Sequence, residues 1–210
     1  MAKRKINKKK VQKLLVLIIL AIIIIVGAIV VIDNLNKEPQ VKESVKVIDS
    51  IKDYKLHENE TEYYKQLFNL LKEELTKEEI NEEEYAKIVA QLFLTDFFTL
   101  DNKLNKNDIG GTQYVYKDFQ TDFEKLARES VYHEIENNIY GDRKQSLPIV
   151  TSVDIVGITQ QSYDYLNKKD NEAFYVDLNI KYEKDLGYQE NVSLIIIHSN
   201  DKLEIAEMSE

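Results

Sequence analysis

The stretch Ala173–Glu183, AFYVDLNIKYE, decides the fold. Apolar or aromatic side chains occupy every second position, and the positions between them carry Tyr175, Asp177, Asn179, Lys181 and Glu183. A period of two is that of a β-strand with one buried and one solvated face. We therefore predict a strand whose core face is formed by Phe174, Val176, Leu178, Ile180 and Tyr182.

Three further segments around this stretch indicate strands. Residues 149–159 are rich in β-branched residues, and Gly157 within them predicts a bulge or a close backbone approach. Residues 191–198 are apolar on both faces, which predicts a central strand, and residues 203–208 form the last strand. Polar turns at 167–171 and from 185 onward separate the strands, so we expect an antiparallel run.

Upstream of the strands the hydrophobic period changes to that of helices. The first predicted helix begins near Asn59 and continues to Leu75, and the third runs over 118–140 with Gly141 placed to end it. Between them, a helix opened by Asn81 and Glu84 at capping-box spacing is apolar over nearly its whole circumference through Leu100. Such a helix must be covered on most sides.

The order of these elements predicts an α+β domain. A short extended segment at 45–56 leads into about three helices, which pack on one face of a curved antiparallel sheet. The glycines at 110 and 111 mark a loop, and they lack the flanking pattern of a phosphate-binding loop.

The N-terminal part of the chain has a different character. Leu14–Ile32 is a run of nineteen residues without an ionisable side chain, about 28 Å long as a helix, which predicts a transmembrane helix. The rival interpretation is a cleaved secretory signal, but such signals have apolar cores of only about 7–15 residues. We therefore favour an uncleaved single-pass anchor.

Charge sets the predicted orientation of this span. Residues 1–13 carry seven basic and no acidic side chains, which places the N-terminus in the cytoplasm and the C-terminal domain outside it, at the cell membrane. We predict a basic cytoplasmic tail at 1–13, a transmembrane helix at 14–32, a linker at 33–44 and an extracytoplasmic domain at 45–210. Residues 33–210, with 21 basic and 37 acidic side chains, carry −16, which does not favour nucleic acid as a partner.

Few residues carry a pattern that indicates chemistry. The three histidines are scattered without metal-ligand spacing, there is no cysteine, and the nucleophile motifs of serine hydrolases are missing from the sequence. We therefore predict no metal, no cofactor and no catalytic residues, and we favour a non-enzymatic role over an enzyme.

Five residues are candidates for a pocket. Asp96 lies within the apolar helix, where a buried carboxylate needs partners or a raised pKa; such a residue more often lies at the rim or caps a neighbour. The other four, which no local motif connects, are Tyr114, His133, Asp142 and Arg143.

The order of elements and the alternation at 174–182 resemble the cystatin-like roll of the nuclear-transport-factor-like (NTF2-like) superfamily. The segments GGTQYVYKDF (110–119), NNIYGDRKQ (137–145) and KDLGYQE (184–190) are similar to stretches in uncharacterised single-span membrane proteins of low-G+C Gram-positive bacteria. Rolls behind a single span include assembly components of conjugation and type IV secretion machines, so the resemblance implies a role of that kind.

Two functions remain open on the sequence alone. The first is a non-enzymatic envelope protein whose external domain binds a protein partner or self-associates. The second is a small-ligand-binding or isomerase-like pocket within the roll, for which Asp96 and the tyrosines would supply the polar groups.

Overall fold

The computed structural model describes residues 45–209. Residues Val45–Glu210 form one compact unit. Within the described residues no helix is long and apolar enough to cross a membrane. The predicted tail at 1–13, the span at 14–32 and the linker at 33–44 lie outside the described residues.

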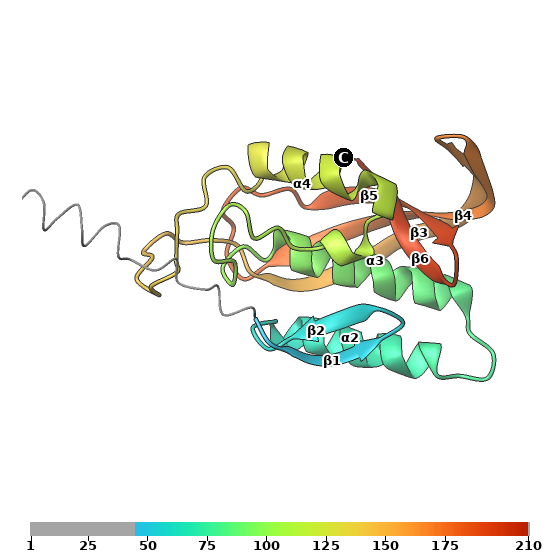
Figure 1. Cartoon of the computed structure of the whole chain (residues 1–210), viewed down its shortest axis with the longest axis horizontal. Helices are drawn as coiled ribbons and strands as arrows, with labels where there is room; N and C mark the ends of the chain where they lie inside the picture. Colours follow the sequence, from blue (N-terminus) through green and yellow to red (C-terminus); the bar gives the residue numbers. More distant parts are fainter. Residues whose placement is uncertain (1–44, 210) are drawn as a thin grey trace, which may run out of the picture. The chain divides into compact units, whose positions relative to one another are not determined.

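A four-stranded antiparallel sheet forms one side of the domain (Figure 1). Its strands follow one another in chain order, each paired with the next: β3 (Val150–Tyr165), β4 (Lys168–Tyr182), β5 (Asn191–Ser199) and β6 (Lys202–Ser209). Together with three α-helices in the described residues, this sheet confirms the α+β class.

The alternation in β4 is confirmed. Phe174, Val176, Leu178 and Ile180 are buried in the core, while Tyr182 at the strand end is partly exposed and packs against it. The bulge at Gly157 is also confirmed, because the register of β3 against β4 shifts between Ile155 and Gly157.

The polar turn predicted at 167–171 is wrong in its extent. Tyr165 pairs with Lys168, so the turn consists of Leu166 and Asn167 only, with Leu166 in the left-handed conformation at φ 50°. The polar residues that follow are already part of β4. Polar side chains indicate that a segment is exposed to solvent, and they do not distinguish a turn from the exposed end of a long hairpin.

The two strands after β4 lie where the sequence predicts them. β5 is a central strand, bonded to β4 on one side and to β6 on the other. Val192, Leu194 and Ile196 join the main core, and Ile197 on the opposite face joins a second small cluster with Tyr116 and Tyr165.

The segment at 45–56 forms a hairpin of two strands, β1 (Val47–Ile51) and β2 (Tyr54–His57). The helix that follows, α2, spans Glu62–Leu75 and starts later than predicted. Its cap is Thr61, whose side chain accepts a hydrogen bond from the Tyr64 N–H, because the chain at Asn59 is still in the turn that leaves β2.

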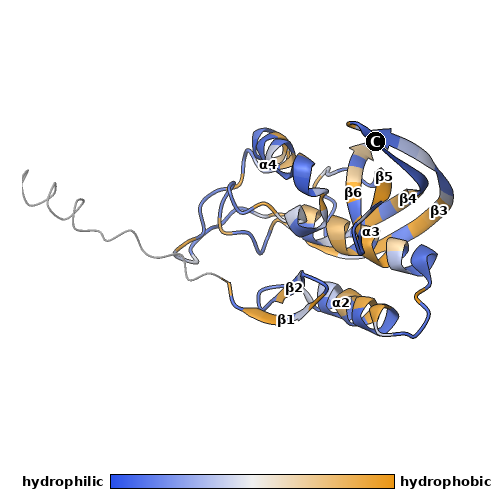
Figure 2. Cartoon of the chain, turned by 45° about the vertical axis from the view of Figure 1, so that its right-hand side comes forward, coloured by the Kyte–Doolittle hydropathy of each residue, from blue (hydrophilic) through white to orange (hydrophobic). Residues whose placement is uncertain are grey.

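The central helix α3 spans Glu82–Phe98, and its predicted cap is confirmed. The Asn81 side chain accepts a hydrogen bond from the Glu84 N–H at 3.1 Å. α3 packs between the sheet and α2, which explains its apolar circumference (Figure 2). It therefore forms the middle layer of the domain.

The third predicted helix is wrong in its length. After two short 3₁₀ turns, η1 (Thr112–Tyr114) and η2 (Lys117–Phe119), α4 spans only Gln120–Glu129. Ser130 leaves the helical conformation with φ −121° and ψ −101°, and Tyr132 turns inward so that its hydroxyl donates to the Phe97 carbonyl at 2.7 Å. With this long-range hydrogen bond to α3, the chain after Glu129 leaves the helical conformation that the local pattern predicts.

Gly141 therefore does not end a helix. It has φ 70° and closes a turn in which its N–H donates to the Asn138 carbonyl at 3.0 Å.

The alternation in β4 leads to a test with a matched control. Val176→Asp places a carboxylate at a side chain that is 1% exposed, and we expect it to abolish folding of the fragment 45–210, since an unpaired buried charge costs more than a domain's net stability of about 5–15 kcal/mol can offset. Val156→Asp makes the same change in β3 at a side chain that is 70% exposed.

We expect the control to melt within about 3 °C of the unmodified fragment, which corresponds to less than about 1 kcal/mol. Circular dichroism during heating provides both measurements. A cooperative, near-native melting transition for Val176→Asp would contradict the assigned strand faces.

Candidate functional site

Asp96, the first candidate residue, lies in the last turns of α3 and is one member of a buried ion pair. Asp96 is 7% exposed, and its carboxylate accepts a hydrogen bond from the Lys103 ammonium, itself 4% exposed, at 2.5 Å. The second carboxylate oxygen accepts from the Gly111 N–H at 2.7 Å. A buried carboxylate with a counter-charge and a backbone donor is satisfied, so Asp96 stabilises the loop that follows α3.

The glycine pair allows this loop to approach α3. A Cβ at Gly110 would lie 2.2 Å from the Asp96 carbonyl oxygen, and Gly111 has φ +76°. The Gly110 N–H donates to the Tyr132 hydroxyl at 3.0 Å. The two glycines therefore serve a close backbone approach.

The electrostatics of this cluster involve a second carboxylate, Glu60. Burial and then the nearby Asp96 raise the pKa of the Glu60 carboxyl to about 7. Burial alone would lower the pKa of the Lys103 ammonium, but the charge of Asp96 and the hydrogen bond to it raise that pKa. Lys103 therefore stays charged as the partner of Asp96.

Tyr114 lies inside the core. Its hydroxyl is hydrogen-bonded to that of Tyr64, and its ring stacks on Tyr54 with centroids 5.3 Å apart. Burial raises the pKa values of the Tyr64 and Tyr114 hydroxyls well above their ordinary values, so both remain neutral. Tyr114 links the β1–β2 hairpin and α2 to the loop after α3.

The three remaining candidates lie apart from this core. Arg143 is partly buried, and its guanidinium donates to the carbonyls of Asp101 at 2.6 Å and Lys103 at 2.9 Å, which holds the same loop from outside. His133 is exposed and contacts only its neighbour Glu134 among the described polar side chains. Asp142 is also exposed, so the structure does not assemble the five residues into one pocket.

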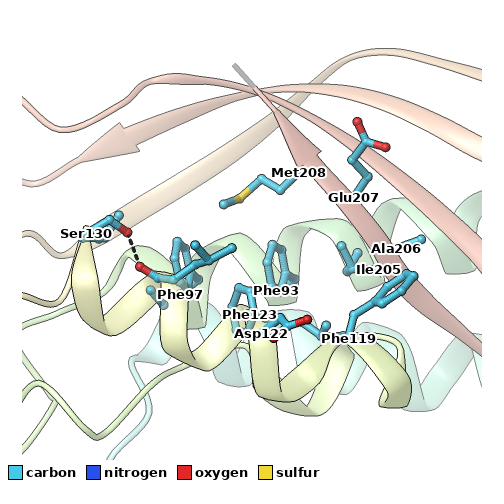
Figure 3. A pocket seen from close by; sticks show the side chains of 14 residues that line it. Phe93, Phe97, Phe119, Asp122, Phe123, Ser130, Ile205, Ala206, Glu207 and Met208 are labelled. Atoms are coloured by element: carbon cyan, nitrogen blue, oxygen red, sulfur yellow. Dashed lines mark hydrogen bonds between the residues drawn. The ribbon is translucent and has the colours of Figure 1, made fainter.

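A concave apolar surface lies elsewhere, between α4 and β6, and we call it the α4–β6 groove (Figure 3). Its volume is about 350 Å³. Phe93 and Phe97 of α3 lie at its base, Phe123 of α4 contacts both rings, and Ile205 of β6 lies opposite. The remaining lining residues are Val115, Phe119, Asp122, Leu126, Ala127, Ser130, Val131, Ala206, Glu207 and Met208.

The groove is partly open, and its charge is of one sign. Leu126 is 65% exposed, and Phe119, Phe123 and Met208 are partly exposed. The only ionisable lining residues are Asp122 and Glu207, both exposed. Residues 45–209 carry 19 basic and 33 acidic side chains, so the whole described domain has a net charge of −14.

Sequence reasoning missed this groove. Phe119, Phe123, Leu126 and Val131 form a periodic stripe, which predicts a fully buried helix face. Because α4 ends at Glu129, only part of that stripe is covered, and Leu126 remains on the surface. No local signal marks this difference.

A polar site lies near the exposed end of the β3–β4 hairpin. The Asp170 carboxylate accepts hydrogen bonds from the backbone N–H of His198 at 2.7 Å and lies 2.9 Å from its ring Nδ1. Burial raises the pKa of the Asp170 carboxyl, but the backbone and ring donors outweigh burial and lower it. This pair connects β4 to β5. Residues 45–209 contain no group of three or more side chains suited to hold a metal ion.

Comparisons of the chain with protein-family models, with curated proteins and with solved structures find no match.

The ion pair leads to a stability prediction. Asp96→Asn leaves the Lys103 ammonium buried without its counter-charge, and we expect the free energy of unfolding to fall by about 3–5 kcal/mol. Asp142→Asn removes the same charge at an exposed position and should change it by less than about 0.5 kcal/mol. Urea unfolding of the fragment 45–210 measures both.

The double variant Asp96→Asn/Lys103→Met separates the ion pair from other effects. Because it removes both charges, we expect it to lose less stability than Asp96→Asn alone. Equal losses in the single and double variants would show that the buried charge of Lys103 is not the cause.

Glu60 leads to a prediction on pH. In an unfolded chain a Glu carboxyl titrates near pH ~4.3, whereas in the folded domain it titrates near pH 7. Between about pH 4.3 and 7 the unfolded state has lost this proton and the folded state has kept it, so the free energy of unfolding falls as pH rises. At about 1.4 kcal/mol per pKa unit, this loss reaches about 4 kcal/mol.

Glu60→Gln removes the titrating group and should therefore flatten this part of the pH dependence. Glu58→Gln, at an exposed position two residues away, should leave it unchanged. Urea unfolding at pH 5, 6, 7 and 8 measures the dependence for each variant. The same slope in Glu60→Gln and in the unmodified fragment would contradict the prediction.

Proposed function

We propose that this protein is a membrane-anchored, non-enzymatic interaction module of the cell envelope. In this proposal Leu14–Ile32 crosses the membrane with the N-terminus in the cytoplasm, and the α+β domain acts outside it. The observation that carries the proposal is the α4–β6 groove, which presents apolar side chains at the surface of an acidic domain.

The lining of the groove supports binding of a protein segment. Protein interfaces are centred on aromatic and aliphatic anchors in partly formed pockets, with a polar rim around them. The groove has this composition, since phenylalanine rings form its base and Asp122 and Glu207 lie at exposed positions along it. Leu126, 65% exposed, is an apolar side chain that a partner would cover.

The arrangement of polar groups argues against catalysis in the groove. A catalytic pocket needs convergent acid, base or nucleophile groups whose positions are held by neighbours. Ser130 is the hydroxyl residue of the lining, and its Oγ already donates to the Leu126 carbonyl at 2.7 Å. Asp96 and Tyr114, which would supply an isomerase-like pocket, are engaged inside the core instead.

The alternative function, binding of a small apolar ligand, is favoured by the size of the groove. A volume of about 350 Å³ is near the lower end of the roughly 300–1,000 Å³ of small-molecule sites. A protein partner accounts in addition for the exposed Leu126 and for the proposed position outside the membrane. The cystatin-like roll and the assembly role in secretion or conjugation machinery, which the sequence resemblance implies, belong to the same proposal.

Photo-cross-linking in intact cells tests the interaction. A photo-reactive amino acid in place of Leu126 in the full-length chain should give adducts with a protein partner. The same amino acid in place of Val156, which is similarly exposed at 70% but lies on β3, should give none.

Substitution adds a quantitative arm to this test. With the photo-reactive amino acid placed at the lining residue Val131, we expect Leu126→Asp to reduce the adducts at least tenfold and Val156→Asp to leave them unchanged. Recovery of monomer alone from the Leu126 and Val131 positions would count against the proposed function. Adducts that disappear when a small apolar compound is added, with no protein attached, would favour the alternative.

A further inference from the structure

Within the part of the chain that the structure describes, the α4–β6 groove contains one unpaired position at the edge of the sheet, Met208. β6 is the last strand of the sheet, so one side of its backbone faces away from β5. Near Ile205 that side is occupied, because the Tyr116 N–H donates to the Ile205 carbonyl at 2.8 Å and Val115 forms a parallel bridge with Ile205. The edge is therefore covered at this point by the chain that leads into α4.

The edge becomes open beyond Ile205. The register of β6 against β5 shifts by one residue at Ala206, so Ile205 pairs with Ile196 and Met208 pairs with Leu194. The Ile205 carbonyl points away from β5, so Ile205 and its partner Ile196 form a pair that exchanges no backbone hydrogen bonds, and the Ile196 backbone groups point to β4. Backbone direction repeats every second residue along a strand, so the backbone groups of Leu194 also point to β4.

Met208 consequently faces away from β5, as Ile205 does. Within residues 45–209 no backbone group outside the sheet bonds to Met208. Its N–H and C=O thus remain free to pair with an added strand, and the Met208 side chain lines the groove beside them.

We propose that the partner adds an extended segment to the Met208 edge of β6, inside the α4–β6 groove, and that this segment is apolar on one face and basic on the other. The inference rests on the proposed function and names the chemistry of the partner. Strand addition at a sheet edge is a recurring mode of peptide recognition, in which main-chain hydrogen bonds supply affinity and alternate side chains supply specificity.

The lining explains the apolar face of the added segment. Side chains on an extended strand alternate between two faces, so every second residue would point toward Phe97 and Phe123 at the base of the groove. Burial of such side chains removes their apolar surface from water and thereby stabilises the complex.

Charge explains the basic face and disfavours a second copy of the chain as the partner. The ionisable side chains of the groove are Asp122 and Glu207, and the domain around them has a net charge of −14. Two copies paired through β6 would bring two Glu207 side chains and two acidic domains together, which is unfavourable. Lysine or arginine on the outer face of the added strand is instead complementary to the Glu207 carboxylate, which accepts a hydrogen bond from the Tyr163 hydroxyl at 2.8 Å, and to the acidic domain around it.

Binding of a defined peptide tests the proposal. The probe is fluorescein-labelled Lys-Val-Lys-Val-Thr-Val-Lys, and the control is Glu-Val-Glu-Val-Thr-Val-Glu, with the full-length chain in phosphatidylcholine nanodiscs and empty discs as the blank. We expect saturable binding of the lysine peptide by fluorescence anisotropy, at least tenfold tighter than binding of the glutamate peptide and weaker in 0.5 M salt.

Two changes test the backbone pairing. Met208→Pro removes the outward N–H and should weaken binding at least tenfold, whereas Met208→Leu keeps it and should change the Kd by less than about twofold. A lysine peptide with N-methylated valines cannot pair through its backbone and should also bind at least tenfold more weakly, whether or not Met208→Pro disturbs the end of β6.

Each opposite result overturns the inference. Failure of the lysine peptide to saturate, or equal binding of the glutamate or the N-methylated peptide, would refute a basic added strand. A dimer of the full-length chain that Met208→Pro dissociates would assign the edge to a second copy. If Leu126 still gives a protein adduct in cells while these peptide results fail, the proposed interaction stands and only strand addition is lost.

Discussion

The burial of α3 from Tyr85 onward is the constraint on which the rest of the structure depends. From Tyr85 to Phe98 every residue of α3 except Lys87 and Gln91 is buried, so the helix needs a sheet on one side and further chain on the other. The regular alternation of β4 supplies the first cover, and the amphipathic α2 supplies the second. The order of the elements along the chain follows from this requirement, because each flank of α3 contributes one layer.

Asp96 is a buried carboxylate that needs hydrogen-bond partners, and the way in which the chain supplies them also produces the groove. The carboxylate requires Lys103 and the Gly111 N–H, so the chain after α3 folds back closely against its last turns. Tyr132 then closes the same region by bonding to Phe97, which draws the chain away from a continued α4. A shorter α4 leaves part of its apolar stripe uncovered beside β6, and a concave apolar surface results.

The groove and the sheet edge beside it are features that the stability of the domain does not require. A phenylalanine-lined surface with an exposed leucine costs solubility in an isolated domain, and an unpaired sheet edge beside it invites association. The acidic charge around both limits association between copies of the chain. These three properties together describe a surface for a basic, apolar partner, and they lie in the part of the chain proposed to be outside the membrane.

The sequence by itself determined the features that depend on near neighbours: the two faces of β4, the bulge at Gly157 and the Asn81 cap of α3. Periodicity and capping are local, so they can be read without knowing the fold. Only the tertiary structure decided that Lys103 pairs with Asp96, that the Tyr132 hydroxyl bonds to the Phe97 carbonyl and that Met208 lies at an open edge of the sheet. These outcomes depend on contacts between distant segments and on strand register, which residue types alone do not specify, and the groove arises from them.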